Sequence, residues 1–280
     1  DIFPLSTPGI HWKALKMLMD SDAPLKVPLK DFWQQIPWFW QFLLTSNEKR
    51  FIAATDALSY LCHSSINDTK ELLEYYNMGE MLEQNGCAFV YDTERSFNKS
   101  LKSWTDRTSR GFISEALNAD KISQVVPTIN DNFKFAYLSH EWGKVSEPID
   151  IVQGLANAVK VDGVIFHPNR VSSVSEKLNS VVIDFDKGSS KYDAVIIAAG
   201  INSVGLAESL GDVLPMTAER GYNITIPSSN IDIDIPIVFA DRGIVATNLT
   251  SGLRIGGWAE YANANRPANQ HYFKSIARIS

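Results

Sequence analysis

The segment from Ser146 to Gly200 constrains the fold more than any other part of this sequence. It opens with a serine, an acidic residue and a proline, continues with apolar residues at helical spacing and reaches Gly163, a pattern that predicts a helix. The alternating segments "VIFHPNRVSSVS" and "SVVIDF" predict strands, and a Lys187-Gly188 turn leads into the apolar segment "AVIIAAG". We expect this last segment to be a buried strand, so the unit belongs to an α/β arrangement.

The expected buried strand ends in three small residues, Ala198, Ala199 and Gly200. Such an end lets a phosphate or ribose approach the backbone and is typical of a flavin or nicotinamide nucleotide site, although close packing of a strand on a helix also needs small residues. The usual partner is a G-x-G-x-x-G turn that opens a helix, whose N–H groups bind the pyrophosphate. None of the 16 glycines fits that pattern. Either the nucleotide interpretation is wrong or the segment that completes the site lies outside this sequence.

Composition and charge exclude several classes of function. With 280 residues, 45% of them hydrophobic and 21% charged, the chain has the composition of a globular protein, and two domains are expected. The formal net charge of −6 and the lack of a basic run argue against nucleic-acid binding, which depends on lysine and arginine. Two cysteines are too few for a disulfide framework, so we expect a reducing, cytoplasmic environment. The five histidines lack metal-ligand spacing, so we expect no metal site.

The regions on either side of this unit predict a different kind of structure. Helical periodicity covers residues 47–83 and 93–119, and the segment "CAFVYD" between them predicts a strand. After Gly205 the chain alternates as strands in "RGYNITIP", "IPIVFAD", "RGIVATNL" and "GLRIGGWAE". We therefore predict a mixed α/β (α+β) protein, with a mixed or antiparallel sheet that is flanked by helices and lines a ligand pocket.

Residues 32–42 form an aromatic cluster, "FWQQIPWFWQF". The apolar run from Ile36 to Leu44 is far shorter than the roughly 18 to 20 residues of a membrane span. The cluster predicts either an aromatic helix buried against a sheet or an interfacial patch that contacts lipid or a partner, and the sequence leaves both open. The first residues lack the charged lead and apolar run of a signal peptide, so we expect no secretion.

Several motifs follow one another in an order that is specific to a known family. They are "PGIHWKALKMLMDSDAPLKV" with "PWFWQFL", "GLANAVKVDGVIFHPNRVSSV", "YDAVIIAAG", "LPMTAERGYNITIP" and "GLRIGGWAEYANAN". As a set they resemble the D-amino-acid oxidase superfamily of FAD-dependent oxidoreductases, most closely its bacterial D-amino-acid dehydrogenase small-subunit type. The resemblance implies that a G-x-G-x-x-G unit precedes this sequence and that a stretch with the substrate-binding arginine follows it.

The resemblance also implies a division of the chain into three regions. Residues 1–145 would be the first part of a substrate or cap domain, residues 146–204 the middle segment of a two-dinucleotide-type FAD domain, and residues 205–280 the second part of the cap domain. On this basis the sequence is an internal fragment, which we expect to be inactive alone and to bind FAD weakly or not at all.

Six residues receive roles from the resemblance. Val171 aligns with a residue whose backbone meets the adenine end of FAD, and the three small residues at 198–200 match the strand end that the phosphate-ribose portion of FAD approaches. Tyr222 matches a position over the substrate face of the flavin, where its hydroxyl would bind the substrate carboxylate, and Arg220 would steer that carboxylate. For each residue an ordinary role in a strand, a core or the surface stays an alternative.

The activity implied for the whole protein is oxidation of the amine carbon of a D-amino acid to an imino acid, with hydride transfer to FAD. Dehydrogenases of this type pass electrons to a membrane quinone. The resemblance therefore implies an electron-transfer partner and a place at the inner face of a bacterial membrane, with residues 32–42 as the contact. Two alternatives stay open: a glycine- or sarcosine-type amine oxidase of the same superfamily, and a non-catalytic binding or scaffold relative.

Overall fold

The computed structural model describes residues 2–10, 25–26, 29–129 and 132–279, and most of the opening motif at 8–27 lies outside these ranges. The helices are α2 (Leu29–Thr45), α3 (Glu48–Tyr75), α4 (Glu94–Thr108), α5 (Ala119–Val125), α6 (Pro148–Val161), α7 (Ser203–Glu208) and α8 (Gln270–Ile279), with short 3-10 turns at Gly79–Met81 and Gly200–Asn202. The strands are β1 (Leu25–Lys26), β2 (Leu82–Glu83), β3 (Cys87–Tyr91), β4 (Ser114–Leu117), β5 (Phe135–Ser139), β6 (Lys144–Val145), β7 (Val171–Lys177), β8 (Ser180–Phe185), β9 (Gly188–Tyr192), β10 (Glu219–Ile226), β11 (Ile237–Phe239), β12 (Ile244–Leu249) and β13 (Gly252–Tyr261).

Side-chain caps set the starting points of α3, α4 and α5. Asn47, Thr93 and Asn118 each accept a hydrogen bond, at 3.0 to 3.1 Å, from the backbone N–H three residues further on. Such a bond satisfies one of the N–H groups that the first turn of a helix leaves without a partner. The helices predicted over 47–83 and from 93 onward are therefore confirmed at their N-terminal ends.

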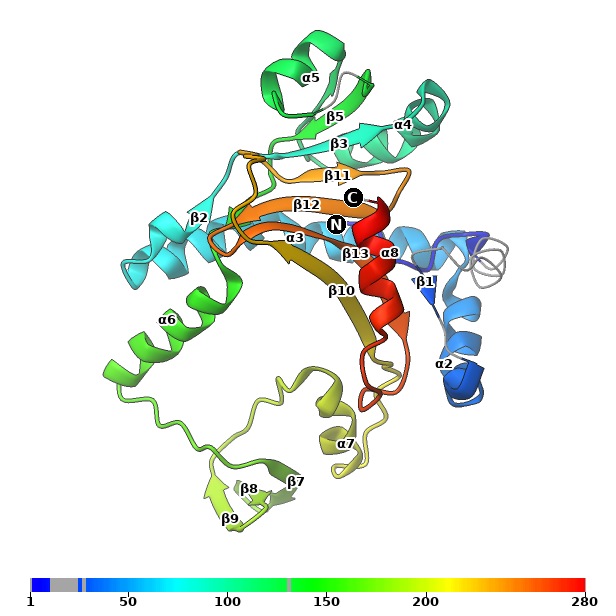
Figure 1. Cartoon of the computed structure of the whole chain (residues 1–280). Coiled ribbons are helices and arrows are strands. Elements are labelled where there is room, and N and C mark those ends of the chain that lie inside the picture. The colour runs from blue at the N-terminus through cyan, green and yellow to red at the C-terminus, as the bar shows by residue number, and fades with distance from the viewer. Residues whose placement is uncertain (1, 11–24, 27–28, 130–131, 280) are drawn as a thin grey trace.

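The main sheet joins strands from distant parts of the chain (Figure 1). Its order is β1, β13, β12, β11, β3, β5 and β4, and β10 also pairs with β13. The β11–β3 and β1–β13 pairs are parallel and the other pairs are antiparallel. The mixed α/β class, with a mixed sheet between helices, is confirmed.

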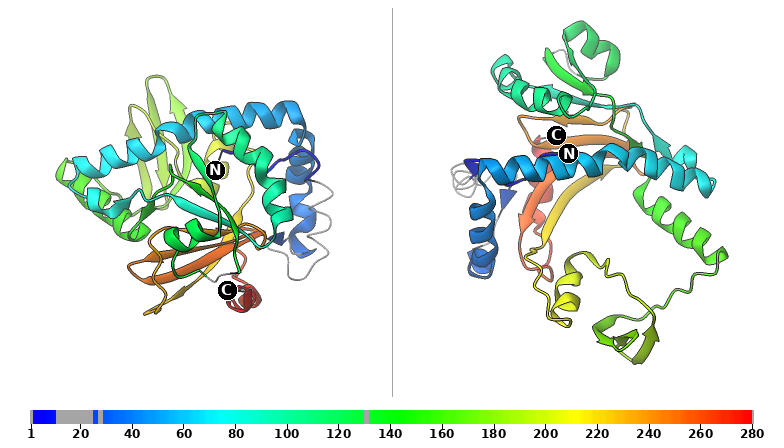
Figure 2. Two further views of the ribbon diagram at one scale, coloured as in Figure 1. Left: turned by 90° about the horizontal axis from the view of Figure 1, so that it is seen from above. Right: turned by 180° about the vertical axis from the view of Figure 1, so that it is seen from behind.

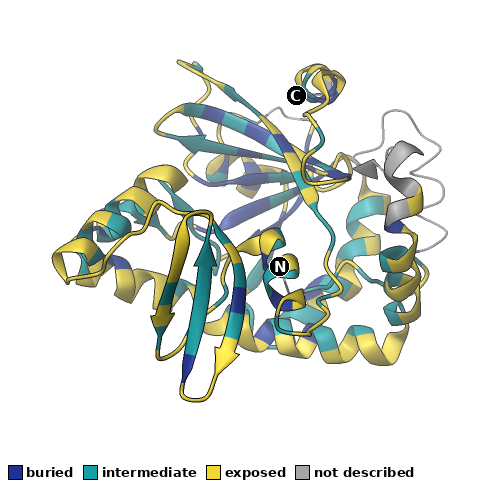
Figure 3. Cartoon of the chain, turned by 90° about the horizontal axis from the view of Figure 1, so that it is seen from below, coloured by how far each residue is buried: buried dark blue, intermediate teal, exposed yellow. Residues whose placement is uncertain are grey.

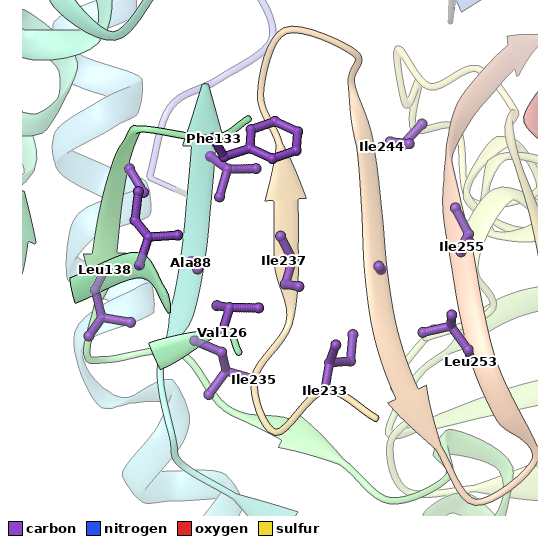
Figure 4. Close-up of a cluster of buried hydrophobic side chains, with 14 of the residues drawn as sticks. Ala88, Val126, Phe133, Leu138, Ile233, Ile235, Ile237, Ile244, Leu253 and Ile255 are labelled. Carbon is purple, nitrogen blue, oxygen red and sulfur yellow. The ribbon is translucent and has the colours of Figure 1, made fainter. Parts of the chain in front are cut away.

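The two faces of this sheet carry different cores, because successive side chains of a strand point to opposite sides. Ala88 and Val90 of β3 join one core with Ile122 of α5 and Ile276 of α8, and Figure 4 shows the aliphatic side chains at its centre. Phe89 and Tyr91 of the same strand lie on the other face, against Trp104 of α4, whose indole N–H donates to the Tyr91 hydroxyl at 2.9 Å. The long helix α3 crosses the sheet on the side opposite α8 (Figures 1 and 2).

A separate three-stranded sheet, β7-β8-β9, lies in the 146–204 region beside α7. Its side chains are mostly exposed or half-buried, as Figure 3 shows, although Val174 is buried. Ser209 connects it to the end of α7, because the Ser209 hydroxyl donates to Val174 C=O and accepts from Val174 N–H. The helix–strand–strand order of this region is confirmed, and the three-way division of the chain stays a prediction.

The buried strand predicted over "AVIIAAG" is wrong for this structure. Residues 194–199 form no strand, and Ile196 is 91% exposed. A strand needs a neighbour that accepts and donates its backbone hydrogen bonds, and no described strand lies beside this segment. The third strand of the small sheet is instead the polar segment β9, which begins at the predicted turn.

Two further predictions need correction. The helical pattern over 93–119 covers α4 only as far as Thr108, and residues 114–117 form β4, because they pair with β5 at an edge of the main sheet. Helix α6 follows Glu147 rather than a serine cap, and no side chain caps it. Ser146 instead accepts, through its C=O, a hydrogen bond from Thr250 N–H at 2.9 Å.

Candidate flavin and substrate site

A groove with a volume of about 480 Å³ lies where three segments of the chain meet. They are the aromatic helix α2, residues 201–218 around α7, and the loop that follows β13. The lining residues are Gln35, Pro37, Trp38, Gln41, Ile201, Val204, Val213, Pro215, Met216, Thr217, Ala218, Ala262, Asn263 and Ala264. The volume falls within the range of small-molecule sites.

Helix α2 is fixed to this groove by one of its faces. The Trp38 ring stacks on Tyr261 of β13 with 5.3 Å between the ring centroids. The buried Gln35 side chain accepts a hydrogen bond from the Thr217 hydroxyl. The Tyr261 hydroxyl donates to Glu219 at 3.0 Å, and burial, together with the Glu219 charge, raises the pKa of Tyr261. The aromatic ring of Trp38 therefore forms part of the groove wall, and Tyr261, which stacks on that ring, stays protonated at neutral pH.

The small residues at 198–200 directly precede Ile201, which lines the groove. Gly200 has a positive φ of 58°, and a side chain there would meet no atom within 4 Å. Ala198 and Ala199 are exposed, and Ala199 N–H donates to the Ser203 hydroxyl at 3.1 Å. The backbone of this segment is open to a large ligand.

Tyr222 lies in the core rather than in the groove. It is 2% exposed, and its hydroxyl donates to Glu260 Oε2 at 2.7 Å and accepts from Asn269 N–H at 3.0 Å. Its ring contacts Tyr272 and Phe273 of α8 edge-on, with 5.0 and 5.2 Å between centroids. Both hydrogen bonds of the hydroxyl are therefore made within the protein, and the predicted contact with a substrate carboxylate stays a prediction.

Arg220 holds the loop that forms part of the groove. It is paired with Glu260 across the β10–β13 ladder, with 3.5 Å between Nη1 and Oε2. Its Nη2 donates to the backbone C=O of Ala264, at 3.2 Å, and of Arg266. Because Ala264 lines the groove, Arg220 helps to fix the position of that part of the groove lining.

Glu260 is the residue that the sequence analysis missed. Its side chain is 1% exposed, and both predicted residues, Arg220 and Tyr222, are bound to it. A signal was present in the sequence, because Glu260 follows Trp258 at the strand period of two and so shares its buried face. Val171, in contrast, begins β7 in the small sheet and does not line the groove.

A second charged cluster joins α6 to the main sheet. Glu147 accepts from Ser251 N–H at 3.3 Å and from Arg254 Nη2 at 3.4 Å, and Arg254 Nε donates to the Thr225 hydroxyl. The hydrogen bonds from Ser251, followed by the charge of Arg254, lower the pKa of Glu147. The cluster fixes the position of α6 relative to the β12–β13 hairpin.

Comparison with known protein families shows which family the chain belongs to. The family model described as FAD dependent oxidoreductase (DAO) matches residues 30–279. The chain belongs to the DAO family of FAD-dependent oxidoreductases. This DAO-family chain is 28% identical over 270 residues to a D-amino-acid oxidase of Bradyrhizobium diazoefficiens and 28% identical over 227 residues to a D-amino acid dehydrogenase of Helicobacter pylori.

The aligned regions cover 96% and 79% of this DAO-family chain, and 64% and 53% of the two relatives. Among solved structures, glycine oxidase from Geobacillus kaustophilus has a TM-score of 0.65 at 15% identity, covering 79% of this chain and 60% of the other. L-proline dehydrogenase from P. horikoshii has a TM-score of 0.65 at 16% identity, covering 80% and 61%. At these identities the likeness shows the fold.

FAD fits one edge of the site in this DAO-family chain. The exposed backbone at 198–200, with open space where Gly200 lacks a Cβ, leaves room for the ribose and phosphate portion of a dinucleotide. The described residues include no glycine-rich turn with N–H groups aimed at a pyrophosphate, in agreement with the lack of G-x-G-x-x-G in the sequence. The residues present would therefore hold one side of the cofactor.

Proposed function

We propose that the protein containing this chain oxidises the amine carbon of a D-amino acid to an imino acid. Membership of the DAO family and similarity to a D-amino-acid oxidase and a D-amino acid dehydrogenase support the proposal. FAD would accept the hydride that leaves the Cα atom, and the imino acid would hydrolyse in water to a keto acid and ammonia. The chain's own residues would orient the substrate and exclude water.

The groove beside Gly200 is the observation that carries this proposal to particular residues. Its lining includes Ile201, which directly follows the open backbone at 198–200, and Ala264 of the loop that Arg220 holds. In this arrangement Ala198, Ala199 and Gly200 would contact the phosphate-ribose portion of FAD, and Val171 its adenine end. Arg220 and Tyr222 would act near the substrate carboxylate, Arg220 chiefly by fixing the loop at Ala264.

A glycine- or sarcosine-type amine oxidase is the alternative that the structure favours next. The structural similarity to glycine oxidase is as great as the similarity to L-proline dehydrogenase, so the fold does not choose a substrate. The Trp38 ring in the groove lining suits a substrate with a side chain better than it suits glycine.

We also propose that electrons leave the protein at a membrane, with α2 as the contact. Helix α2 exposes Trp33 (76%), Trp40 (63%) and Leu44 (57%), and residues 32–47 include no charged side chain. Tryptophan on such a face suits the boundary between lipid and water. No helix among the described residues is long and apolar enough to cross a membrane. Flotation with anionic vesicles tests the contact: the native protein should float, and a Trp33→Ser/Trp40→Ser double variant should not.

The visible absorption spectrum of the native protein, recorded before and after anaerobic addition of D-alanine, tests the proposed reaction. We expect a flavin band that bleaches with D-alanine and persists with L-alanine, glycine and sarcosine. Bleaching by glycine or sarcosine alone would establish the alternative substrate class. A preparation without any flavin band would contradict both and favour a non-catalytic relative.

A further inference from the structure

A second cavity lies on the face of the main sheet that carries α5 and α8. Its volume is about 370 Å³, and apolar side chains of β11, β12 and β13 and of the segment after α5 form most of its lining. Phe133, Ile233, Ile237, Ile244, Leu253 and Ile255 line it and are each less than 10% exposed, and Figure 4 shows these side chains beside one another across the strands. No residue lines both this cavity and the groove beside α2.

The cavity has a charged mouth made by one arginine and one aspartate. Arg242 lies in the turn between β11 and β12, and its Nη2 and Nε donate to the two carboxylate oxygens of Asp92, at 3.0 and 3.3 Å. Both side chains line the cavity and are about one third to two fifths exposed. The pair therefore stands between the apolar interior and the solvent.

The mouth is held in place from several sides. The Arg242 guanidinium lies 5.5 Å from the Phe133 ring centroid and 5.7 Å from that of Phe239, both in the cavity wall. The carboxylate of Asp241 accepts from Asp92 N–H at 2.8 Å and from the Ser96 hydroxyl at 2.7 Å. Asp92 is thus held through its backbone N–H and Arg242 through two aromatic rings, in addition to their contact with each other.

We propose that this cavity binds a free α-amino acid with an apolar side chain, with the ligand carboxylate at Arg242 and the ligand ammonium group at Asp92. A ligand with a single charge would leave one of the two mouth residues without a partner of opposite sign. Because Arg242 and Asp92 are in direct contact, the two charges of the ligand must also be close together, as they are on the two substituents of one carbon atom. An aliphatic side chain such as that of leucine then lies in the apolar interior and occupies part of it.

Binding of the ligand breaks the ion pair between Arg242 and Asp92. This step costs little free energy, because exposed ion pairs contribute little to stability. The ligand restores a carboxylate to Arg242 and supplies a cation to Asp92, so the number of charge pairs does not fall. Burial of the aliphatic side chain among isoleucine, leucine and phenylalanine supplies the favourable part of the binding free energy.

Methyl NMR of the native protein, labelled at isoleucine methyl groups and titrated with DL-leucine, tests this site. We expect the methyl signals of Ile237, Ile244 and Ile255 to shift, while that of Ile183 in the separate small sheet stays unchanged. Isocaproate and isoamylamine, which carry the leucine side chain with only one of the two charges, should each bind at least about tenfold more weakly, the loss that a missing charge-assisted hydrogen bond produces.

Variants of Arg242 and Asp92 test whether leucine binding depends on the mouth of this cavity. Arg242→Gln and Asp92→Asn should each weaken leucine binding about tenfold or more. Arg110→Gln is the matched control, because Arg110 donates through Nε and Nη2 to Asp56 far from the cavity lining, and it should leave the affinity unchanged. If Arg242→Gln does not fold, Asp92→Asn carries the test.

Three results would overturn the proposal: no shift of the cavity methyl signals at millimolar leucine, equal affinity in a folded mouth variant, or equal binding of leucine and isocaproate. The methyl titration needs no turnover. Its outcome is therefore independent of whether D-alanine reduces the flavin.

Discussion

At the scale of single residues, the carboxylate of Glu260 organises the end of the main sheet. Its side chain is almost completely buried and is bound by Tyr222 and Arg220, whose other contacts reach α8 and the loop at Ala264. A buried charge is tolerated only when donors surround it, so removal of one donor should be costly. Strand, loop and helix α8 are coupled through this one carboxylate.

The variant Tyr222→Phe tests this coupling, because it removes the hydroxyl and keeps the ring. We expect the free energy of unfolding to fall by about 1 to 3 kcal/mol, the cost of a buried polar group that loses a partner. Urea denaturation followed by circular dichroism measures the change. Tyr60→Phe, at a tyrosine that is 81% exposed, should change stability by no more than about 0.5 kcal/mol. Equal effects of the two variants would contradict a structural role for the Tyr222 hydroxyl.

The family resemblance pointed to Tyr222 and Arg220, whose roles at a substrate carboxylate stay predictions, but not to Glu260, which connects them. Their common position on β10 follows from alternation, whereas their contact with Glu260 depends on the register between β10 and β13. That register includes an irregularity between Tyr222 and Asn223, which local periodicity does not reveal. The groove likewise depends on the meeting of segments about 180 residues apart, such as Gln35 and Thr217.

At the scale of elements, the pair Gly256 and Gly257 shapes β13 beside that irregularity. Gly257 has a φ of +141°, and a Cβ there would lie 2.1 Å from the backbone oxygen of Gly243. Only glycine fits such a position, because both the conformation and the space exclude a side chain. Close approach of β12 to β13 at the β11–β12 turn therefore requires this residue.

Gly257→Ala should lower the free energy of unfolding by about 2 to 5 kcal/mol, from backbone strain and steric overlap together. Gly221→Ala is the matched control, since Gly221 lies on the neighbouring strand β10 with no atom within 4 Å of an added Cβ and without a positive φ. We expect the control to change stability by less than about 1 kcal/mol. Thermal unfolding of both variants gives the comparison, and a stable Gly257→Ala protein would show that the hairpin can shift.

Elements with a clear periodicity of their own were predicted well, and elements that depend on a neighbouring strand were not. Helix α6 and strands β10 to β13 form where the sequence places them. Residues 114–117 have a helix-like pattern but form strand β4, because they pair with β5 through backbone hydrogen bonds. Residues 194–199 have a strand-like pattern without a ladder, and they stay irregular. In both cases pairing outweighs local propensity.

At the scale of the whole molecule, FAD affinity depends on more than the residues at 198–200. These residues fit one edge of a dinucleotide, and the sequence lacks the glycine-rich turn that binds a pyrophosphate. We therefore expect the 280-residue chain to retain FAD weakly or not at all in equilibrium dialysis. Tight retention would show that the described residues supply the pyrophosphate donors themselves. A circular dichroism spectrum of the same sample, recorded without FAD, verifies that the chain is folded.

The division of the chain into regions 1–145, 146–204 and 205–280 came from the resemblance rather than from local pattern. In the structure the first and third regions share the main sheet, while β7, β8 and β9 of the middle region form the small one. Composition alone could not reveal that residues 1–145 and 205–280 share one sheet, because their strands come together only when the chain folds.

This shared sheet has a consequence for synthesis on the ribosome. β3 ends at Tyr91 and its parallel neighbour β11 begins at Ile237, so roughly 150 residues must be translated between them. At roughly 5 to 20 residues per second this takes roughly 7 to 30 s, during which one edge of β3 has no partner. An exposed strand edge is a template for aggregation. The edge of β3 therefore makes the nascent chain prone to aggregation until β11 emerges and pairs with it.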